Sequence, residues 1–149
     1  MPSLTQSKTL PYSSNQMQSL VMDIEKYPEF LPWCKQAKIV EQISADNLRA
    51  DLLINFKSFF EKYRSDVKHG RSSDGGHFID VVAIEGPFKK LVNNWKFRDL
   101  EDGKCQVEFF IEFEFNSIFL TKMLGVIFER ATEKMMTAFE GRALEMFGS

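Results

Sequence analysis

The sequence has little of what metal sites and disulfide scaffolds need. Its 149 residues include two cysteines, Cys34 and Cys105, and two histidines, His69 and His77. Two cysteines exclude a disulfide-rich scaffold and a four-cysteine zinc site. The sequence also contains no HExxH, GxSxG or Walker pattern, so we expect neither a metal nor a catalytic residue, and predict a protein that is not an enzyme. A reducing bacterial cytoplasm suits such a chain.

Long hydrophobic runs and an excess of one charge are also absent. The longest apolar-dominated stretch, 119–128, has about half of the ~20 residues that cross a bilayer. The first 15 residues have neither the apolar run of a signal peptide nor the character of a transit peptide. Nineteen basic and twenty-one acidic residues give a net charge of −2, so DNA is not an expected partner.

Aromatic residues, by contrast, are abundant. The chain has 15 Phe, three Tyr and two Trp, which together make 13% of its residues. Each aromatic side chain buries ~150–250 Å². So many rings in a chain that forms a single domain over residues 1–149 predict either a thick core or a core with a ring-lined hole.

The first forty residues predict a strand followed by short helices. Residues 5–10 suit a short strand, and Ser13 with Gln16 forms a capping-box pattern. One apolar helix face follows it, with the spacing i, i+3, i+4, i+7, at Met17, Leu20, Val21 and Ile24. Pro28 and Pro32 then prevent a long helix, so residues 27–33 should form an aromatic turn region.

Between residues 38 and 115 the hydrophobic period changes to two. Apolar and polar residues alternate in successive segments, as expected of strands with one buried and one solvated face. Turn signals separate these segments at 46–47, 74–76, 86–87 and 102–103. Because such short connections cannot cross over, the strands should form an antiparallel meander.

The C-terminal segment predicts one long helix over residues 119–147, with Ser117 as its N-cap. At ~1.5 Å per residue this helix would cross the whole sheet. The fold class is therefore α+β. A curved antiparallel sheet of six or seven strands wraps around the long C-terminal helix, and short helices follow the first strand. Gly125 inside the helix either allows close packing on the sheet or leaves room for a ligand.

Four motifs, in order, resemble one known family. They are Tyr27–Cys34 (YPEFLPWC), Gly86–Leu91 (GPFKKL) with Trp95–Phe97, Phe113–Phe115, and Ala138–Ala143 (AFEGRA). These segments resemble the coenzyme Q-binding protein family of the START-like superfamily, which includes bacterial ribosome-association toxins. The resemblance covers nearly the whole chain. It implies a helix-grip fold, a cavity for a quinone or another lipid, and, in some members, an effect on ribosomal subunit association.

Alternation and this resemblance together predict the ligand site. The ligand, ubiquinone or a related prenyl lipid, should lie between the sheet and the C-terminal helix, and no other cofactor is required. Tyr63 and Asn93 should hydrogen-bond the quinone oxygens. The predicted lining residues are Leu52, Ile54, Phe56, Tyr63, Val81, Asn93, Trp95, Phe97, Phe109, Ile111, Phe113, Met123, Ile127 and Ala131.

Two further surfaces are candidates for partners. Phe88 with Lys89 and Lys90, together with Phe59 in a second aromatic turn, could form a membrane-docking portal at the inner membrane, although Phe88 could instead fold back as a lid. Cations with outward parity could contact the large ribosomal subunit, although acidic residues share their face. These cations are Lys62, Arg64, Lys68, Lys96 and Arg98.

Three features leave alternatives open. Cys34 beside Lys35 is either a reactive thiolate or a buried structural residue. Glu41 and Glu61 lie either on the inner face of the sheet, where burial would raise their pKa, or at its wet rim. Related folds also serve polyketide aromatases and cyclases, but the sequence offers no convincing acid–base pair for that chemistry.

Overall fold

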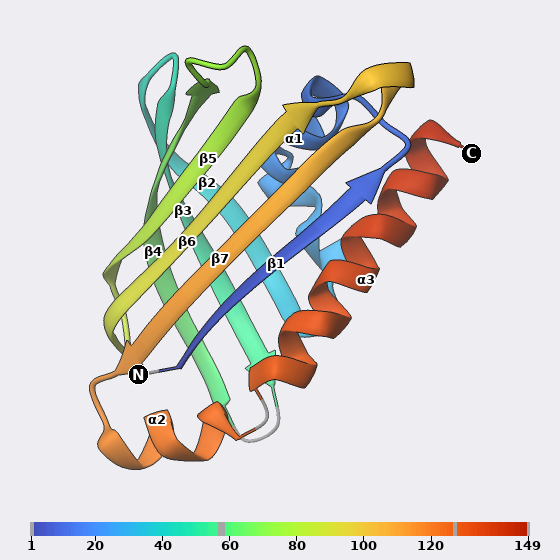
Figure 1. Ribbon diagram of the computed structural model, residues 1–149. Helices are drawn as coiled ribbons and strands as arrows, with labels where there is room; N and C mark the ends of the chain where they lie inside the picture. Colours follow the sequence, from blue (N-terminus) through green and yellow to red (C-terminus); the bar gives the residue numbers. More distant parts are fainter. Residues whose placement is uncertain (1, 57–58, 127, 149) are drawn as a thin grey trace.

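Alternation of apolar and polar residues produces a sheet with one dry face. The computed structural model describes residues 2–56, 59–126 and 128–148, without the side chain of Phe56. Its seven strands form one antiparallel sheet in the order β1-β7-β6-β5-β4-β3-β2 (Figure 1). They are β1 (Ser3–Leu10), β2 (Cys34–Ser44), β3 (Asn47–Phe56), β4 (Phe59–Arg71), β5 (His77–Glu85), β6 (Phe88–Asp99) and β7 (Cys105–Phe115). The predicted antiparallel meander is confirmed, and β1 begins two residues earlier than expected.

Short helices connect β1 to β2, as the sequence predicts. Helix α1 (Ser14–Met22) starts with the expected capping box, in which the Ser13 hydroxyl accepts from the backbone N–H of Gln16 and the Gln16 side chain accepts from the backbone N–H of Ser13. A 3-10 helix, η1 (Ile24–Glu29), contains Pro28. A second one, η2 (Glu101–Gly103), lies in the turn between β6 and β7.

Helix α1 is fixed to the sheet by a polar contact of the buried Ser14. The backbone N–H and the hydroxyl of Ser14 both donate to the Asp99 carboxylate, at 2.8 and 2.6 Å. His77 Nδ1 lies 2.9 Å from the same hydroxyl. These hydrogen bonds hold the pKa of Asp99 below its ordinary value. They join α1 to β5 and β6, and so close one end of the concave face.

The C-terminal segment is not the single helix that its composition suggested. Helix α2 (Ile118–Gly125) ends at Gly125, and α3 (Phe128–Phe147) starts three residues later and runs along the sheet (Figure 1). A Cβ atom added at Gly125 would lie 3.2 Å from Pro2 Cγ. The glycine therefore allows close packing against the N-terminal segment and lines neither of the main cavities.

Local hydrogen bonds fix where α2 starts. Ser117 is its N-cap, as predicted, and accepts from the backbone N–H of Leu120. The Thr121 hydroxyl accepts from the backbone N–H of Phe115 and donates to the carbonyl of Ser117. This second contact links α2 to the end of β7, so α2 crosses the end of the sheet while α3 covers its face (Figure 1).

The turn between β5 and β6 requires a glycine. Gly86 has a φ of +131°, and a Cβ atom there would lie 2.6 Å from the Cβ of Tyr63. We expect Gly86→Ala to destabilise the protein by about 2–4 kcal/mol, because the free-energy cost of the strained backbone adds to that of the steric overlap with Tyr63. Urea denaturation measures this change.

Gly141 provides the matched control for Gly86. It lies in α3, and no atom lies within 4 Å of an added Cβ there. Gly141→Ala should therefore raise the free energy of unfolding, by up to ~1 kcal/mol. Equal effects of the two substitutions would contradict the close approach of the β5–β6 turn to Tyr63.

Candidate functional site

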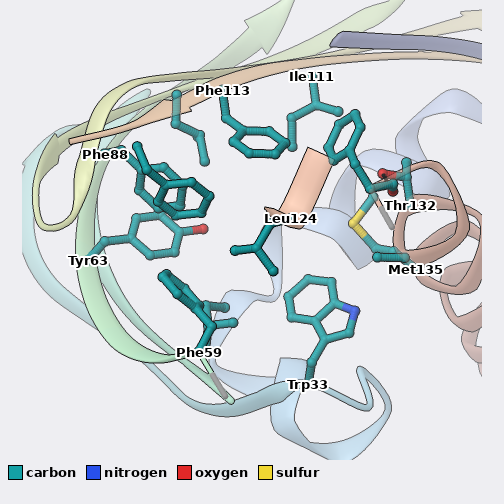
Figure 2. Close-up of a pocket in the computed structure, with 14 residues that line it drawn as sticks. Trp33, Phe59, Tyr63, Phe88, Ile111, Phe113, Leu124, Thr132 and Met135 are labelled. Carbon is teal, nitrogen blue, oxygen red and sulfur yellow. Dashed lines mark hydrogen bonds between the residues drawn. The ribbon is translucent and has the colours of Figure 1, made fainter. Parts of the chain in front are cut away.

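Two adjoining cavities lie between the concave face of the sheet and the C-terminal helices. Their volumes are about 160 and 100 Å³. Side chains that line both are Trp33, Tyr63, Leu91, Ile111 and Met135. We call the larger one, next to α2, the outer cavity, and the smaller one, next to α1 and η1, the inner cavity. Figure 2 shows the ring of side chains around the outer cavity.

Aromatic rings form most of the outer cavity wall. Phe88 stacks on Phe115 with a centroid distance of 4.7 Å and meets Tyr63 edge-on at 5.1 Å. Phe113 of β7 contacts Phe128 of α3 with a centroid distance of 4.7 Å, so this pair joins the sheet to the helix at the cavity wall. Rings are stiff and wide, and such pairs add stability beyond area burial. They therefore keep a space open that smaller, more flexible side chains would fill.

Most of the predicted lining residues do line these cavities. Ile54, Phe113 and Ala131 line the outer cavity, and Tyr63 and Ile111 line both. Leu52, Val81, Asn93 and Trp95 line the inner one. Ile127 and the side chain of Phe56 lie outside the described residues. Whether these residues bind a ligand remains a prediction.

Three predicted lining residues lie elsewhere. Phe97 and Phe109 are fully buried in the core and line neither main cavity. Both contact Trp95, which lies at the inner cavity, at centroid distances of 5.9 and 4.8 Å. Met123 is 38% exposed because α2 turns away from the axis of α3 and presents Leu124 to the cavity instead. A charge at Phe97 would thus unfold the core, not block a pocket.

Phe88 folds inward as a lid. Its ring lines the outer cavity (Figure 2), so it does not point outward as a membrane wedge. Lys89 and Lys90 are exposed but pair with Glu114 and Glu112 at 3.4 and 2.6 Å. Phe59, expected at the portal, is buried and also lines the outer cavity. Neither ring therefore forms an exposed wedge at this turn, and a membrane contact of the turn stays a prediction.

Sequence reasoning missed the lining residues that come from the irregular segments. Trp33 lies in the connection to β2, and Tyr27 and Leu31 come from η1 and its end. The aromatic turn over residues 27–33 was the available signal, but alternation assigns no face to residues outside a strand. Met135 of α3, which is not among the predicted lining residues, also lines both cavities.

Polar groups are few on the inner surface. The Asn93 amide N–H donates to the carbonyl of Phe110 at 3.0 Å, and its side-chain oxygen accepts from Trp95 Nε1 at 3.1 Å. Both polar atoms of this side chain are therefore already hydrogen-bonded within the sheet. Burial raises the pKa of the Tyr63 hydroxyl, as does the nearby Cys34, while Ser65 opposes this shift. Tyr63 therefore stays protonated at neutral pH and can donate a hydrogen bond into either cavity.

Reactive groups are disfavoured at this site. Burial raises the pKa of the Cys34 thiol to about 11, so the structural interpretation of this cysteine holds. Glu41 and Glu61 are exposed, which places them at the wet rim. Among the described residues, no group of three or more His, Cys, Asp or Glu side chains is arranged to hold a metal ion.

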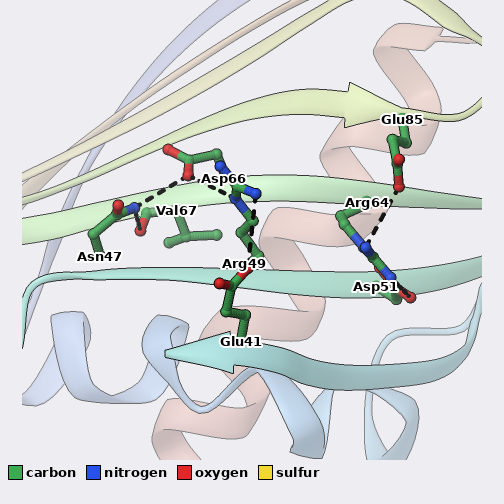
Figure 3. A network of polar contacts seen from close by, with 8 residues as sticks. All are labelled: Glu41, Asn47, Arg49, Asp51, Arg64, Asp66, Val67 and Glu85. Carbon is green, nitrogen blue, oxygen red and sulfur yellow. Dashed lines mark hydrogen bonds and ion pairs between the residues drawn. The ribbon is translucent and has the colours of Figure 1, made fainter. Parts of the chain in front are cut away.

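The outer face of the sheet carries paired charges. Arg64 makes a bidentate contact with Asp51, at 2.7 and 3.2 Å, and lies 3.5 Å from Glu85 (Figure 3). This arginine holds the pKa of Asp51 below its ordinary value. Lys62 lies 3.8 Å from the same carboxylate. Two of the cations predicted to contact RNA are thus compensated within the sheet.

The remaining predicted cations lie on the same outer face. Lys68, Lys96 and Arg98 are exposed and form no ion pair within the described part of the chain, although Arg98 donates to the Gln106 side chain. A surface groove of about 560 Å³ beside the β4–β5 turn is lined by Lys96, Arg98 and Arg71. Asp80 and Glu108 line it too, so this groove is mixed in charge.

Comparison with known proteins assigns the family. Residues 10–140 match the family described as polyketide cyclase/dehydrase and lipid transport. The chain belongs to this family. It is 41% identical to the ribosome association toxin RatA of Rickettsia prowazekii, over 98% of this chain and 99% of that protein. It is also 30% identical to the mitochondrial coenzyme Q-binding protein COQ10 homolog B of Xenopus laevis, over 97% of this chain and 59% of that protein.

Solved structures with the same fold include one with substantial sequence identity. The solution structure of an 18 kDa protein from Caulobacter crescentus has a TM-score of 0.77 and 34% identity, with both chains fully covered. A START superfamily protein from Mycobacterium smegmatis has a TM-score of 0.81 over 98% of this chain and 99% of that one, at 17% identity. The predicted helix-grip fold and the resemblance to the coenzyme Q-binding and RatA proteins are confirmed.

Proposed function

We propose that this chain binds a hydrophobic ligand of the quinone or prenyl-lipid class in the two cavities and carries it without chemical change. The pair of ring-lined cavities between the sheet and α3 is the observation that carries this proposal. Burying apolar ligand surface contributes ~25 cal/mol per Å², so affinity would come mainly from the apolar part of the ligand. The family description, which includes lipid transport, supports the same class.

Cavity size constrains how a long ligand would bind. Each cavity is smaller than the roughly 300 Å³ at which typical ligand pockets begin. A prenyl tail would therefore extend out of the outer cavity, past Leu124 on the inner side of α2. The tail end of the ligand would then emerge beside α2 at the end of the sheet.

The outer side of α2 fits the surface of a lipid bilayer. Val126, Ile118 and Phe119 are 85%, 76% and 72% exposed, and Phe60 of β4 adds a further exposed ring. At ~1.5 Å per residue the eight residues of α2 span about 12 Å, so this helix would lie in the interface. The exposed Lys122 would face anionic headgroups. No helix within the described residues is long and apolar enough to cross a membrane.

A carrier role agrees with the chemistry of the cavities better than an enzymatic one. The aromatase/cyclase Zhui from Streptomyces sp. R1128 has the same fold, with a TM-score of 0.80 but 14% identity, which shows the fold alone. Here the pKa of the buried Cys34 thiol is raised, and Glu41 and Glu61 are exposed at the rim of the sheet. Among the described residues, the lining of the two cavities therefore supplies no carboxylate or thiolate as a general base.

Filling the outer cavity tests the carrier role. Ala131 of α3 lines this cavity, so the ring in Ala131→Phe would occupy the space of the ligand. We expect loss of the quinone that is extracted with the purified wild-type protein, with stability changed by no more than about 1–3 kcal/mol. Native mass spectrometry followed by solvent extraction measures the bound ligand.

Thr137→Phe is the matched control, because Thr137 lies on the solvent side of the same helix. It should leave the amount of bound quinone unchanged. If Ala131→Phe retained the full amount of quinone, the ligand would not occupy the outer cavity and the proposal would fail.

Charges on α2 test the membrane contact. The double variant Ile118→Asp, Phe119→Asp should lose sedimentation with vesicles of phosphatidylethanolamine and phosphatidylglycerol, because two carboxylates cannot enter the interface. The control variant Leu144→Asp, Met146→Asp changes two exposed apolar residues on α3 and should bind as the wild type does. Light scattering measures the oligomeric state of both proteins. If the wild type were a dimer and the α2 variant a monomer, this face would instead contact a second copy of the chain.

Ribosome association is a second candidate, favoured by the 41% identity to the Rickettsia toxin. Because Lys62 and Arg64 are compensated, the contact would use the groove that contains Lys96 and Arg98. Lys96→Glu, Arg98→Glu should then abolish co-sedimentation with large ribosomal subunits, and wild-type binding should fall with salt. The control is the double variant Arg130→Glu, Lys134→Glu, which makes the same charge change on α3 and should leave co-sedimentation unchanged. An equal loss of co-sedimentation in both variants would indicate non-specific attraction.

A further inference from the structure

Among the described residues, one hydroxyl on the inner surface is fully buried without a hydrogen bond of normal geometry. Three polar residues of the described chain are buried: Ser14, Ser65 and Thr132. Ser14 is bonded to Asp99, and Thr132 donates to the carbonyl of Phe128 at 3.0 Å. Ser65 of β4 is 1% exposed, and its hydroxyl makes no hydrogen bond of normal geometry among the described residues, although it lies close enough to the Tyr63 hydroxyl to oppose the rise in the pKa of that group. Its side chain lines the inner cavity.

Trp33, which lines the same cavity as Ser65, also has a buried polar atom without a hydrogen-bond partner in the described part of the chain. Trp33 lines both cavities, and its indole Nε1 is buried without a partner among the residues the structure describes. Trp95 provides the contrast, because its Nε1 donates to Asn93 Oδ1 at 3.1 Å. In Figure 2 the indole of Trp33 reaches into the ring of apolar side chains around the outer cavity.

Buried polar atoms without partners are rare, because each loses its hydrogen bonds to water and gains none in return. The described residues contain four such atoms. Arg49 Nε lies 3.5 Å from Asp66 Oδ1 in an ion pair, and neither Arg49 nor Gln6 lines a main cavity. The other two, on Trp33 and Ser65, both line the proposed ligand site.

We propose that Trp33 and Ser65 are the hydrogen-bond donors that select a ligand with acceptor oxygens and fix its orientation. An indole N–H can only donate, and a serine hydroxyl can donate to a carbonyl. The fitting chemistry is a carbonyl-bearing ring, such as a quinone, with an apolar chain. A pure hydrocarbon would leave both donors unpaired. This assignment rests on the proposed carrier function, and it replaces Asn93, whose amide is already used within the sheet.

The positions of the two donors also set the direction of the ligand. Ser65 lines only the inner cavity, whereas Trp33 lies where the two cavities adjoin. The oxygen-bearing ring would therefore occupy the inner cavity and the junction. The apolar chain would lie in the outer cavity, among Phe88, Phe113 and Leu124, and leave toward α2.

Two probes separate this proposal from the carrier function. Hexyl-para-benzoquinone carries the carbonyl oxygens, and hexylbenzene has the same chain without them. Isothermal titration calorimetry of the wild-type protein should give tighter binding of the quinone. In Trp33→Phe and in Ser65→Ala the affinity for the quinone should fall about five- to tenfold, the loss expected for one hydrogen bond. The affinity for hexylbenzene should stay within about twofold of the wild-type value.

The control is Tyr12→Phe, which removes a hydroxyl outside both main cavities and should leave both affinities unchanged. Ser65→Ala should also have a melting temperature no lower than that of the wild type, since it removes an unpaired polar group. A lowered melting temperature would reveal an internal partner for Ser65 and overturn its assignment.

The outcomes distinguish the two proposals. Quinone affinity that is unchanged in both Trp33→Phe and Ser65→Ala, but lost in Ala131→Phe, overturns the donor assignment and leaves the carrier function standing. Wild-type protein that binds neither probe overturns the carrier function, and the donor assignment with it. A wild-type protein that binds hexylbenzene as tightly as the quinone overturns the donor assignment alone.

Discussion

Contacts between aromatic rings on the sheet and on α3 determine the shape of the protein's interior. Phe139 of α3 meets Trp95 edge-on at 5.2 Å, and Phe128 meets Phe113 at 4.7 Å. These two contacts set the distance between the helix and the concave face at two points. Rings keep their shape when packed, so the space between the contacts cannot close as it would around aliphatic side chains. Both cavities are consequences of this spacing.

The rest of the molecule closes this space at its ends. The capped helix α1, held to β6 by Ser14 and Asp99, covers the inner end. Helix α2, held to β7 by Thr121, covers the outer end and presents Leu124 to the cavity. The eight residues of α2 turn Leu124 inward, and much of the opposite side of this helix is apolar and exposed. The outer cavity and the exposed apolar side of α2 thus lie at the same end of the sheet, where the proposal has the ligand leave.

The solvated face of the sheet follows a different physical constraint. Cross-strand pairs such as Arg64 with Asp51 satisfy the charges locally, and exposed pairs of this kind contribute little to stability. They do reduce the attraction of this face for phosphate groups, since each cation already has a carboxylate neighbour. On this face Lys68, Lys96 and Arg98 form no ion pair within the described part of the chain, and Lys96 and Arg98 line the surface groove. The two candidate functions therefore use opposite sides of the same sheet.

The sequence alone determined the periodic parts of this protein. Alternation between residues 38 and 115 specified the antiparallel sheet and which side chains face inward, and short polar patterns located the caps at Ser13 and Ser117. Only the tertiary structure decided where along the inner face the space remains. Phe97 and Trp95 point to the same side of β6, yet Phe97 is packed in the core and Trp95 lines the inner cavity. The difference depends on which part of the strand lies next to Phe139 of α3.

The break between α2 and α3, the inward turn of Phe88 and the unpaired donors on Trp33 and Ser65 also depend on contacts between distant segments. Helix propensity and periodicity describe neighbours along the chain, so they carry no information on whether a buried N–H or O–H finds a partner across the fold. That question is decided only when the strands, the turn before β2 and the C-terminal helix are packed together.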